Sequence, residues 1–436
     1  LASSAASMCI RDRIYDDPFD IIAHLMVGSE GTLAFLSEVT MKTEHDYPYS
    51  ASAMLYFSNI KDACRAVVAM KPGPVFSAEL LDKKSLASVN DTTGTGLTAV
   101  LTETKADTPE ELQANIEEIK KILSPFETVT PIHFTDKPEE YSKYWAIRSG
   151  IFPSVGGTRR PGTTVLIEDV AFPLKELPEA TADLQELLVT NEYHDACIYG
   201  HALEGNFHFI ISQSFDSPEQ VARYEKLMDE VKTLVVDKYD GSLKAEHGTG
   251  RNMAPFVKYE WGERAYGFMK AVKELFDPKG LLNPGVIFNE DPHCHLKHFK
   301  PMPLTNAHVD KCIECGFCEV NCLTCGFSLS SRQRIVIQRE ISRLKKLSDT
   351  ESSERLKTLQ KQYKYLGNAT CAGDGLCSMS CPMGINVGDL THDIRLANLP
   401  EKSIGYKTGD FVANHFAETK SALRPVLYLA NMAHNM

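Results

Sequence analysis

Eight cysteines lie between residues 312 and 381, and the spacing of the first four is typical of an iron–sulfur cluster loop. The pattern C-x₂-C-x₂-C-x₃-C lets three thiolates of one loop face a single cubane and sends the fourth to a second cluster. These four residues are Cys312, Cys315, Cys318 and Cys322. Short gaps in a long chain favour metal ligation in a reducing compartment over a disulfide scaffold. Structural zinc is the weaker interpretation, because zinc sites rarely use this spacing.

A second copy of the motif, TCAGDGLCSMSCP, has an aspartate at the position of its second cysteine. In two-cluster ferredoxins the fourth cysteine of each motif ligates the other cluster. This rule assigns Cys312, Cys315, Cys318 and Cys381 to cluster one, and Cys322, Cys371 and Cys377 to cluster two. The fourth ligand of cluster two is either the Asp374 carboxylate, a harder ligand than thiolate, or the extra thiol of Cys325. A [3Fe–4S] cluster on three cysteines is the alternative to a second [4Fe–4S] cluster. In the plainest interpretation, Asp374 only begins a solvated turn.

The segment YGHALEGNFHF predicts a second metal site. His201 ends one expected strand, His208 lies in the next, and the Gly-Asn pair between them allows a turn. The two imidazoles then meet at the mouth of the strands, where Glu246 of AEHGTG can add a carboxylate. Two histidines and one carboxylate with open positions suit Zn²⁺, Mn²⁺ or Fe²⁺. The structural alternative is a pair of hydrogen-bonded histidines on a half-buried sheet.

Two further side chains are candidates for acting on a substrate. Arg148 in WAIRSG can hold a carboxylate through two parallel hydrogen bonds, although a surface ion pair on a helix also explains it. Arg159 and Arg160 are alternative anchors, but a solvated loop suits them better. His247 follows Glu246, and adjacent residues of an extended segment point in opposite directions. One of the two can therefore bind metal while the other faces the substrate, and the ordinary pKa of histidine suits proton transfer near neutral pH.

Alternating strand and helix patterns must position these residues. Strands are expected at 51–57, 97–104, 162–173 and within 196–212, and helices at 59–70, 108–123, 177–191 and 217–239. Residues 20–43 predict a helix, a Gly-rich turn and an alternating strand. This order indicates an α+β domain with helices on one side of its sheet. A Pro- and His-rich linker follows, and residues 330–363 form a long charged helical stretch between the cysteine motifs.

Several segments resemble known families. VGSEGTLAF resembles the closing segment of the FAD-binding domain in vanillyl-alcohol-oxidase and PCMH-type flavoproteins. Four further segments resemble the C-terminal domain of FAD-linked 2-hydroxyacid dehydrogenases. They are YWAIRSGIFPSVG, YGHALEGNFHF, AEHGTGRN and LFDPKGLLNPGVIF. The cysteine region is similar to the α-helical ferredoxin domain of fumarate reductase iron–sulfur subunits and of anaerobic glycerol-3-phosphate dehydrogenase. Together these segments resemble the large FAD and iron–sulfur D-lactate dehydrogenases of anaerobic bacteria.

The resemblance implies a domain order. Residues 1–47 would be a remnant of the PCMH-type FAD-binding domain, with 1–13 foreign or disordered. Residues 48–290 would form the ferredoxin-like antiparallel sheet domain of FAD-linked oxidases, and 291–306 the linker. An all-α two-cluster ferredoxin domain would occupy 307–400, and 401–436 would begin a truncated helical region. We therefore expect the chain to be a fragment that lacks most of its FAD-binding domain.

The resemblance also implies site residues. FAD would lie against Gly28, Ser29, Gly31, Thr32, Asn283 and Gly285. A divalent metal would bind His201, His208 and Glu246, with His247 as the base and Arg148 as the anchor of the substrate. One departure is Glu204, because the family often reads G-D-G-N where this chain reads L-E-G-N.

The expected function is a flavin-dependent D-2-hydroxyacid dehydrogenase that acts on D-lactate. Hydride would pass to FAD, and single electrons would cross the two clusters to a quinone or an electron-carrier protein. Alternative substrates are D-2-hydroxyglutarate, glycolate and glycerol 3-phosphate. In the alternative of a different class, the chain is a non-catalytic electron-transfer module.

The net charge and the hydropathy of the chain limit the classes of partner that we expect. The net charge of −12 gives no electrostatic support for nucleic-acid binding. No run of about 18 apolar residues is present, so we expect no transmembrane segment. The predicted location is the cytoplasm, with peripheral attachment to the inner face of the cytoplasmic membrane as a variant.

Overall fold

The computed structural model describes residues 16–89, 96–399 and 403–434, and these fall into two units. Unit one comprises residues up to Leu304 together with Asp310–Ile313, and unit two comprises Thr305–Val309 and the chain from Glu314 onward. Residues 1–15 lie outside the description, and with them Cys9 and the segment predicted to be foreign or disordered.

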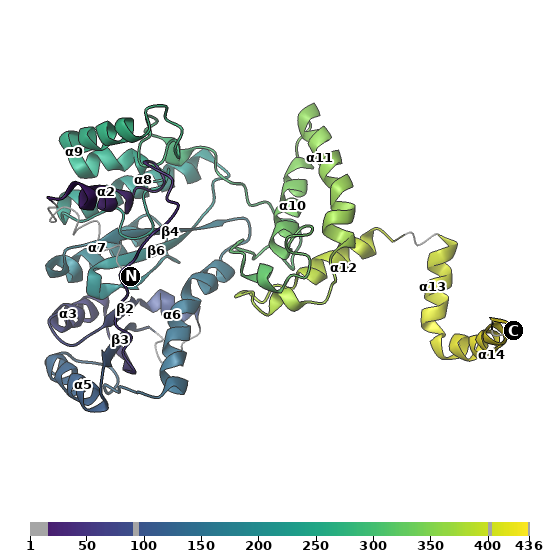
Figure 1. Cartoon of the computed structure of the whole chain (residues 1–436), viewed down its shortest axis with the longest axis horizontal. Coiled ribbons are helices and arrows are strands. Elements are labelled where there is room, and N and C mark those ends of the chain that lie inside the picture. Colours follow the sequence, from purple (N-terminus) through teal and green to yellow (C-terminus); the bar gives the residue numbers. More distant parts are fainter. Residues whose placement is uncertain (1–15, 90–95, 400–402, 435–436) are drawn as a thin grey trace. The chain divides into compact units, whose positions relative to one another are not determined.

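Unit one is built around a six-stranded sheet (Figure 1). Every neighbouring pair is antiparallel, in the order β1-β3-β2-β5-β6-β4. The strands are β1 Tyr49–Phe57, β2 Ser77–Leu81, β3 Thr98–Ala106, β4 Thr164–Ala171, β5 Cys197–His201 and β6 Asn206–Gln213. This confirms the predicted antiparallel α+β domain.

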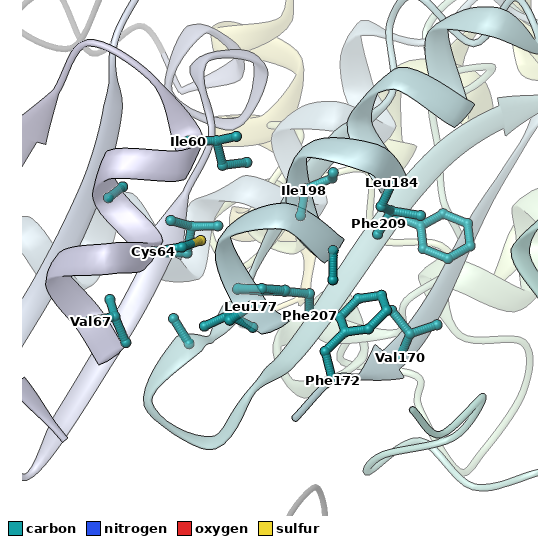
Figure 2. Packing of buried hydrophobic residues seen from close by; sticks show 14 of the residues in the cluster. Ile60, Cys64, Val67, Val170, Phe172, Leu177, Leu184, Ile198, Phe207 and Phe209 are labelled. Carbon is teal, nitrogen blue, oxygen red and sulfur yellow. The ribbon is translucent and has the colours of Figure 1, made fainter. Parts of the chain in front are cut away.

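Four helices cover one face of this sheet with an apolar core (Figure 2). They are α3 Ile60–Met70, α5 Pro109–Leu123, α7 Leu177–Thr190 and α8 Pro218–Lys232. Three of them begin where the sequence places a capping side chain: Asn59, Thr108 and Ser217 each accept a hydrogen bond from a backbone N–H three residues later. Phe207 and Phe209 of β6 are completely buried beneath these helices.

The prediction of helices on one side only is wrong. The second face is covered by α4 Lys83–Ser88 and α6 Pro138–Thr158, and Figure 1 shows α6 across the sheet from α3 and α5. Ile151 and Val155 of α6 pack with Leu101 and Ile210 of the strands. Strand residues alternate between faces, so strands that are apolar at successive positions require cover on both sides.

The strand expected after the Gly-rich turn is also wrong. Helix α2 spans Pro18–Met26, but residues 33–47 form no strand in the structure. A strand needs a hydrogen-bonded neighbour, and none of the described strands pairs with this segment. Most of its large apolar side chains are exposed, Phe35 by 87% and Met41 by 80%, whereas Leu33 is buried.

The rest of unit one consists of α9 and the segment predicted to be a linker. Helix α9 spans Ala254–Phe276 and is broken at Gly262, whose φ is 74°. Within the predicted linker, Phe299 stacks on Phe215 with 3.7 Å between ring centroids, and His295 is buried beside Phe256. This part of the linker therefore packs onto unit one.

Unit two is helical, as predicted. Its helices are α10 Ser331–Leu344, α11 Thr350–Tyr363, α12 Val387–Ala397, α13 Ile404–Asn414 and α14 Phe416–His434. The long charged stretch is divided between α10 and α11. Helix α10 begins with a capping box formed by Ser330 and Gln333, and Asp349 caps α11. None of the described helices combines the length and the apolar character needed to cross a membrane.

Candidate active site and cluster motifs

A row of polar side chains lies on the sheet face that α4 and α6 cover. Glu79 of β2 pairs in register with His201 of β5, and His208 of β6 lies between Tyr199 and Asp169 of the flanking strands. Three of these, Glu79, Asp169 and His208, are at most 4% exposed. A buried polar group is costly unless it finds partners, so their contacts define the site.

His201, His208 and Glu246 converge, as the sequence predicted. The Nε2 atoms of His201 and His208 lie 3.1 and 2.8 Å from the same oxygen, Oε1 of Glu246. A short turn, Ala202–Glu204, joins the two strands and ends at Gly205 with φ of 71°. A Cβ atom there would lie 2.3 Å from the carbonyl oxygen of Phe172, so only glycine fits this position.

This donor set fits a divalent metal. Its three candidate ligand atoms lie within 4.8 Å of one another. His201 Nδ1 lies 2.5 Å from Glu79 Oε1, a second carboxylate that orients the ring as in carboxylate–histidine–metal sites. His208 Nδ1 is buried without a hydrogen-bond partner. The pKa of Glu246 is held well below its usual range by hydrogen bonds from the two histidines, and Glu246 and Glu79 raise the pKa of His201 to about 9.

Asp169 organises the loop that carries Glu246 and His247. Its Oδ2 accepts the backbone N–H groups of Ala245, Glu246 and His247 at 3.1, 2.5 and 3.1 Å. The loop bends around this oxygen and is not extended, so the expectation that Glu246 and His247 point in opposite directions is wrong. Asp169, His208 and His247 also form a possible ligand group. Because an oxygen of Asp169 is already shared by three donors, the group with Glu246 is better suited to a metal.

His247 lies directly against the candidate ligands. Its ring stacks on that of His208 with 4.6 Å between centroids and 7° between planes, and Nε2 lies 3.9 Å from Glu246 Oε1. About a third of the side chain is exposed. Burial lowers the pKa of His247, against the opposing pull of Asp169. A neutral imidazole, which can accept a proton, is therefore favoured near neutral pH.

Arg148 reaches the same site through Glu79. Its Nε donates to Glu79 Oε2 at 2.9 Å, and its guanidinium lies 5.1 Å from the ring centroid of Tyr199. This hydrogen bond uses Nε alone, which leaves both Nη groups for a ligand. Arg159, in contrast, is buried and donates to the carbonyls of Gly156 and Thr163, so it is neither solvated nor placed to anchor a substrate.

The segments predicted to contact FAD lie together in unit one. The carboxylate of Glu30, in the Gly-rich turn, accepts the N–H groups of Thr249 and Gly250 at 2.5 and 2.7 Å. Asn283 Nδ2 donates to the carbonyl of Glu30 at 2.6 Å. Gly28, Gly31 and Gly285 all have positive φ, and a Cβ on Gly28 would meet no atom within 4 Å, which leaves room for a cofactor. The hydroxyls of Ser29 and Thr32 instead donate within the turn, to Met26 and Ser29 carbonyls.

Sequence reasoning missed Glu79 and Asp169. Each is an acidic residue in a largely apolar strand: Glu79 is the one acid of SAELL, and Asp169 follows Glu168 in TVLIEDVA. A buried charge at an inward position of a strand is rarely found without a partner, and that was the available signal.

In unit two, a cavity lies between the predicted ligands of cluster two. Its lining residues are Asn321, Cys322, Leu323, Thr324, Ser331, Arg334, Cys371, Ala372, Gly373, Asp374, Gly375, Cys377, Val387 and Gly388. Three thiols around one cavity fit an iron–sulfur cluster. Asp374 belongs to the lining, whereas Cys325 does not and is exposed. The Asp374 carboxylate accepts the N–H of Leu376 at 3.1 Å.

Electrostatic contacts link thiols both within and between the two predicted ligand sets. Burial raises the pKa of Cys318, and the neighbouring thiols that add to this are Cys381, Cys377 and Cys315. Burial also raises the pKa of Cys377, with Cys371 and Cys322 as its neighbours. Cys322 differs: burial acts to raise its pKa, but hydrogen bonds from Thr324, Ser331 and Arg334 outweigh it and the pKa is lowered.

Comparison with known proteins gives two domain matches. Residues 48–287 match the C-terminal domain of FAD linked oxidases, and residues 308–385 match the 4Fe-4S dicluster domain.

Curated relatives are similar to part of this chain. The mitochondrial D-lactate dehydrogenase [cytochrome] of Arabidopsis thaliana is 29% identical over 62% of this chain and 48% of its own length. The glycolate oxidase subunit GlcD of Bacillus subtilis is 25% identical over 62% of this chain and 57% of its own. A D-lactate dehydrogenase of Anaerostipes hadrus is 25% identical over 61% and 58%. The chain thus spans about half the length of the relatives it matches. Among solved structures, p-cresol methylhydroxylase with substrate bound matches with a TM-score of 0.43 and 15% identity over 56% of this chain and 53% of its own.

Proposed function

Since this chain belongs to the family of FAD-linked oxidases and carries a 4Fe-4S dicluster domain, we propose that it is part of a D-2-hydroxyacid dehydrogenase. The observation that carries the proposal is the convergence of His201, His208, Glu246 and His247, joined to Arg148 through Glu79. A cation, a base and a metal-ligand set within one site match the carboxylate, the hydroxyl proton and the hydroxyl oxygen of a 2-hydroxyacid.

D-Lactate is the substrate we favour. Its support is the similarity to relatives named D-lactate dehydrogenase from a plant and a bacterium. Glycolate is the second candidate, supported by the similarity to glycolate oxidase subunits. The two acids differ by one methyl group, so the shared residues serve either substrate.

Arg148 would bind the substrate carboxylate. Its Nε is held by Glu79, so the guanidinium is oriented before the substrate arrives and both Nη groups can donate in parallel. Side-chain order that exists before binding reduces the entropy lost in the complex.

His247 would remove the hydroxyl proton. The neutral ring that burial favours can accept it, and stacking on His208 fixes the plane of the ring. When bound, the cofactors would supply the remaining chemistry: the metal polarises the hydroxyl, FAD accepts hydride and the clusters carry single electrons. Glu246 and the two histidines would hold the metal, and Gly28, Gly31, Asn283 and Gly285 would lie against FAD.

For the second cluster we propose Cys322, Cys371, Cys377 and Asp374 as ligands. Asp374 is preferred to Cys325 because it lines the cavity that the three cysteines share. The ligand set Cys312, Cys315, Cys318 and Cys381 for the first cluster stays a prediction, as do a quinone or carrier protein as the acceptor and attachment to the cytoplasmic membrane.

The test uses the complete gene product, purified anaerobically with its cofactors. D-Lactate, glycolate, L-lactate, D-2-hydroxyglutarate and glycerol 3-phosphate are added separately, and flavin bleaching and cluster reduction are followed by absorbance. We expect rapid bleaching with D-lactate, followed by cluster reduction. If no 2-hydroxyacid bleaches the flavin while dithionite still reduces the clusters, the hydroxyacid proposal is wrong and the electron-transfer module remains.

Substitutions of Arg148 and His247 test the roles proposed for these two residues. Arg148→Ala should raise KM for the acid, and His247→Asn should lower kcat with metal content unchanged. Arg65→Ala is the matched control, because Arg65 is an exposed arginine paired with Asp62 on α3. Equal activity of all three variants would contradict the assigned roles.

A further inference from the structure

A fully buried arginine, Arg334, lies beside the cavity of cluster two. It is 1% exposed and sits in the first turns of α10. Its Nη1 donates to Cys322 Sγ at 3.6 Å, within the range of a hydrogen bond to sulfur. The side chain therefore touches a proposed cluster ligand with a positively charged group.

The remaining partners of Arg334 are neutral oxygens. Nε donates to the carbonyl of Gly367 at 2.7 Å, and Nη2 donates to the hydroxyls of Thr324 and Thr370 at 2.9 and 3.1 Å. Both hydroxyls donate their own protons to backbone carbonyls, of Leu329 and Leu366, so they can only accept from the arginine. The guanidinium is held in one orientation, with one amino group toward the sulfur.

Arg334 differs from the other arginines of its helix in having no acidic partner among the described residues. Arg332 pairs with Glu319 at 3.2 Å, Arg339 with Glu314 at 2.5 Å and Arg343 with Glu340 at 2.8 Å. A buried cation without a counter-ion is strongly unfavourable, so an anion is expected next to it. The cavity beside Cys322 is the place for that anion.

We infer that Arg334 is the counter-charge of the second cluster and raises its reduction potential. A cluster held by thiolates is anionic, and reduction adds one electron and one negative charge. A fixed cation and an N–H···S hydrogen bond stabilise the reduced form more than the oxidised form. The inference rests on the dicluster domain of the proposed function, but not on the identity of the hydroxyacid.

Cations also lie near the first motif: the guanidinium of Arg159 donates to the carbonyls of Lys311 and Cys312 at 2.8 and 3.0 Å, whereas the arginines near Cys315 and Cys318 pair with acids. Gly316, between these cysteines, lies near Glu319 and Arg332, which neutralise each other, and Glu314 beside Cys315 is neutralised by Arg339.

The test is a redox titration of the complete protein, purified anaerobically, with dithionite and mediators in the absence of any hydroxyacid. Reduced clusters are counted by electron paramagnetic resonance, and iron and sulfide are assayed in each sample. Cys377→Ser identifies the signal of the second cluster. Failure of the hydroxyacid proposal would leave this titration unaffected, so the two ideas fail separately.

Arg334→Gln should make reduction of the second cluster at least tenfold less favourable, a fall of about 59 mV for a one-electron couple. The first cluster should keep its midpoint. Arg343→Gln is the matched control, because it removes a charge from the same helix at a residue paired with Glu340 and should shift neither midpoint.

Arg334→Lys keeps the charge but loses the planar fork, so it should lower the same midpoint by a smaller amount. It decides the question if Arg334→Gln loses iron. An unchanged midpoint in Arg334→Gln, or an equal shift in Arg343→Gln, would overturn the inference, and an unchanged midpoint in Arg334→Lys would remove the contribution of the hydrogen bond to sulfur.

Discussion

The two faces of the sheet in unit one are built from the same strands, but one is apolar and the other carries a row of polar side chains. Under α3, α5, α7 and α8, strand side chains such as Phe207 and Phe209 are apolar and fully buried. Under α4 and α6, an apolar patch gives way to the polar row of Glu79, His201, His208 and Asp169. Phe207 and His208 are neighbours in sequence but belong to opposite faces, because side chains alternate along a strand.

The two faces differ in how burial of their side chains contributes to the stability of unit one. An apolar face gains stability from burial itself, about 1.5–3 kcal/mol for a large side chain. A buried polar row adds stability only when every group is satisfied, and here the orphaned Nδ1 of His208 shows that the row is not. We therefore regard the first face as the source of stability and the second as a site maintained for ligands.

Phe207→Ala should break the stabilising face. Its loss leaves a cavity in the core beneath α3 and α7, and we expect about 3–5 kcal/mol lower free energy of unfolding for unit one. Urea unfolding followed by tryptophan fluorescence measures this, because Trp145 and Trp261 both lie in unit one.

The neighbouring change His208→Leu is the matched control for that measurement. It removes an imidazole whose Nδ1 has no partner but whose Nε2 contacts Glu246 at 2.8 Å, so the metal-free protein should lose about 1–2 kcal/mol, less than Phe207→Ala loses. Metal binding should be lost. Equal destabilisation by the two substitutions would remove the proposed difference between the faces.

Glu79→Gln should weaken metal binding by about 10–100-fold, the usual effect of removing a residue that orients a ligating histidine. It should also raise KM for the acid, because Arg148 loses its charged partner. Competition with a chelating dye measures the metal affinity without any turnover. Glu103→Gln, on the adjacent strand β3 and paired with Lys105, should leave both quantities unchanged. Unaltered metal affinity in Glu79→Gln would show that Glu79 is not an orienting residue.

Asp82 gives the helical cover of the site face a pH dependence. It caps α4 and is buried, and burial raises its pKa to about 6, against hydrogen bonds from Ser85. A carboxyl whose pKa is raised on folding stabilises the fold at low pH and loses that contribution as pH rises through the folded value. Relative to Asp82→Asn, the wild-type chain should lose roughly 1–2 kcal/mol of stability between pH 5 and pH 7. Paired urea titrations of the two proteins would show a constant difference if Asp82 does not titrate in this range.

Glu204→Ala should have the smallest effect. Glu204 is the departure from the family pattern next to the candidate ligands, but its carboxylate pairs at 2.9 Å with Lys71, which follows α3 on the opposite face. Both side chains are about 40% exposed, so the pair contributes less than about 1 kcal/mol. Metal affinity should stay within twofold of wild type, and a larger change would place Glu204 in the site.

Local patterns in the sequence were enough to predict several elements. The capping residues Asn59 and Thr108 begin helices where expected, because capping depends on a few adjacent backbone groups. The cysteine spacing predicted the cluster domain, since ligand loops are short and local, and the dicluster match confirms it. The resemblance of quoted motifs to FAD-linked oxidases was likewise confirmed over residues 48–287.

Where the sequence reasoning failed, the deciding contact came from elsewhere in the chain. The alternating pattern of residues 33–47 could not show that no described strand pairs with it, and the apolar residues of α6 did not show which face they cover.

The sequence by itself determined which residue types are available: two histidines, an acid, a base and an arginine in unit one, and two cysteine loops in unit two. Tertiary structure alone decided which of them meet. Glu79 joins His201 to Arg148 across 122 and 69 residues of chain, and Asp169 bends a loop 76 to 78 residues away. Such partners are set by strand register and by the need to satisfy buried charge, and neither is written in any short segment.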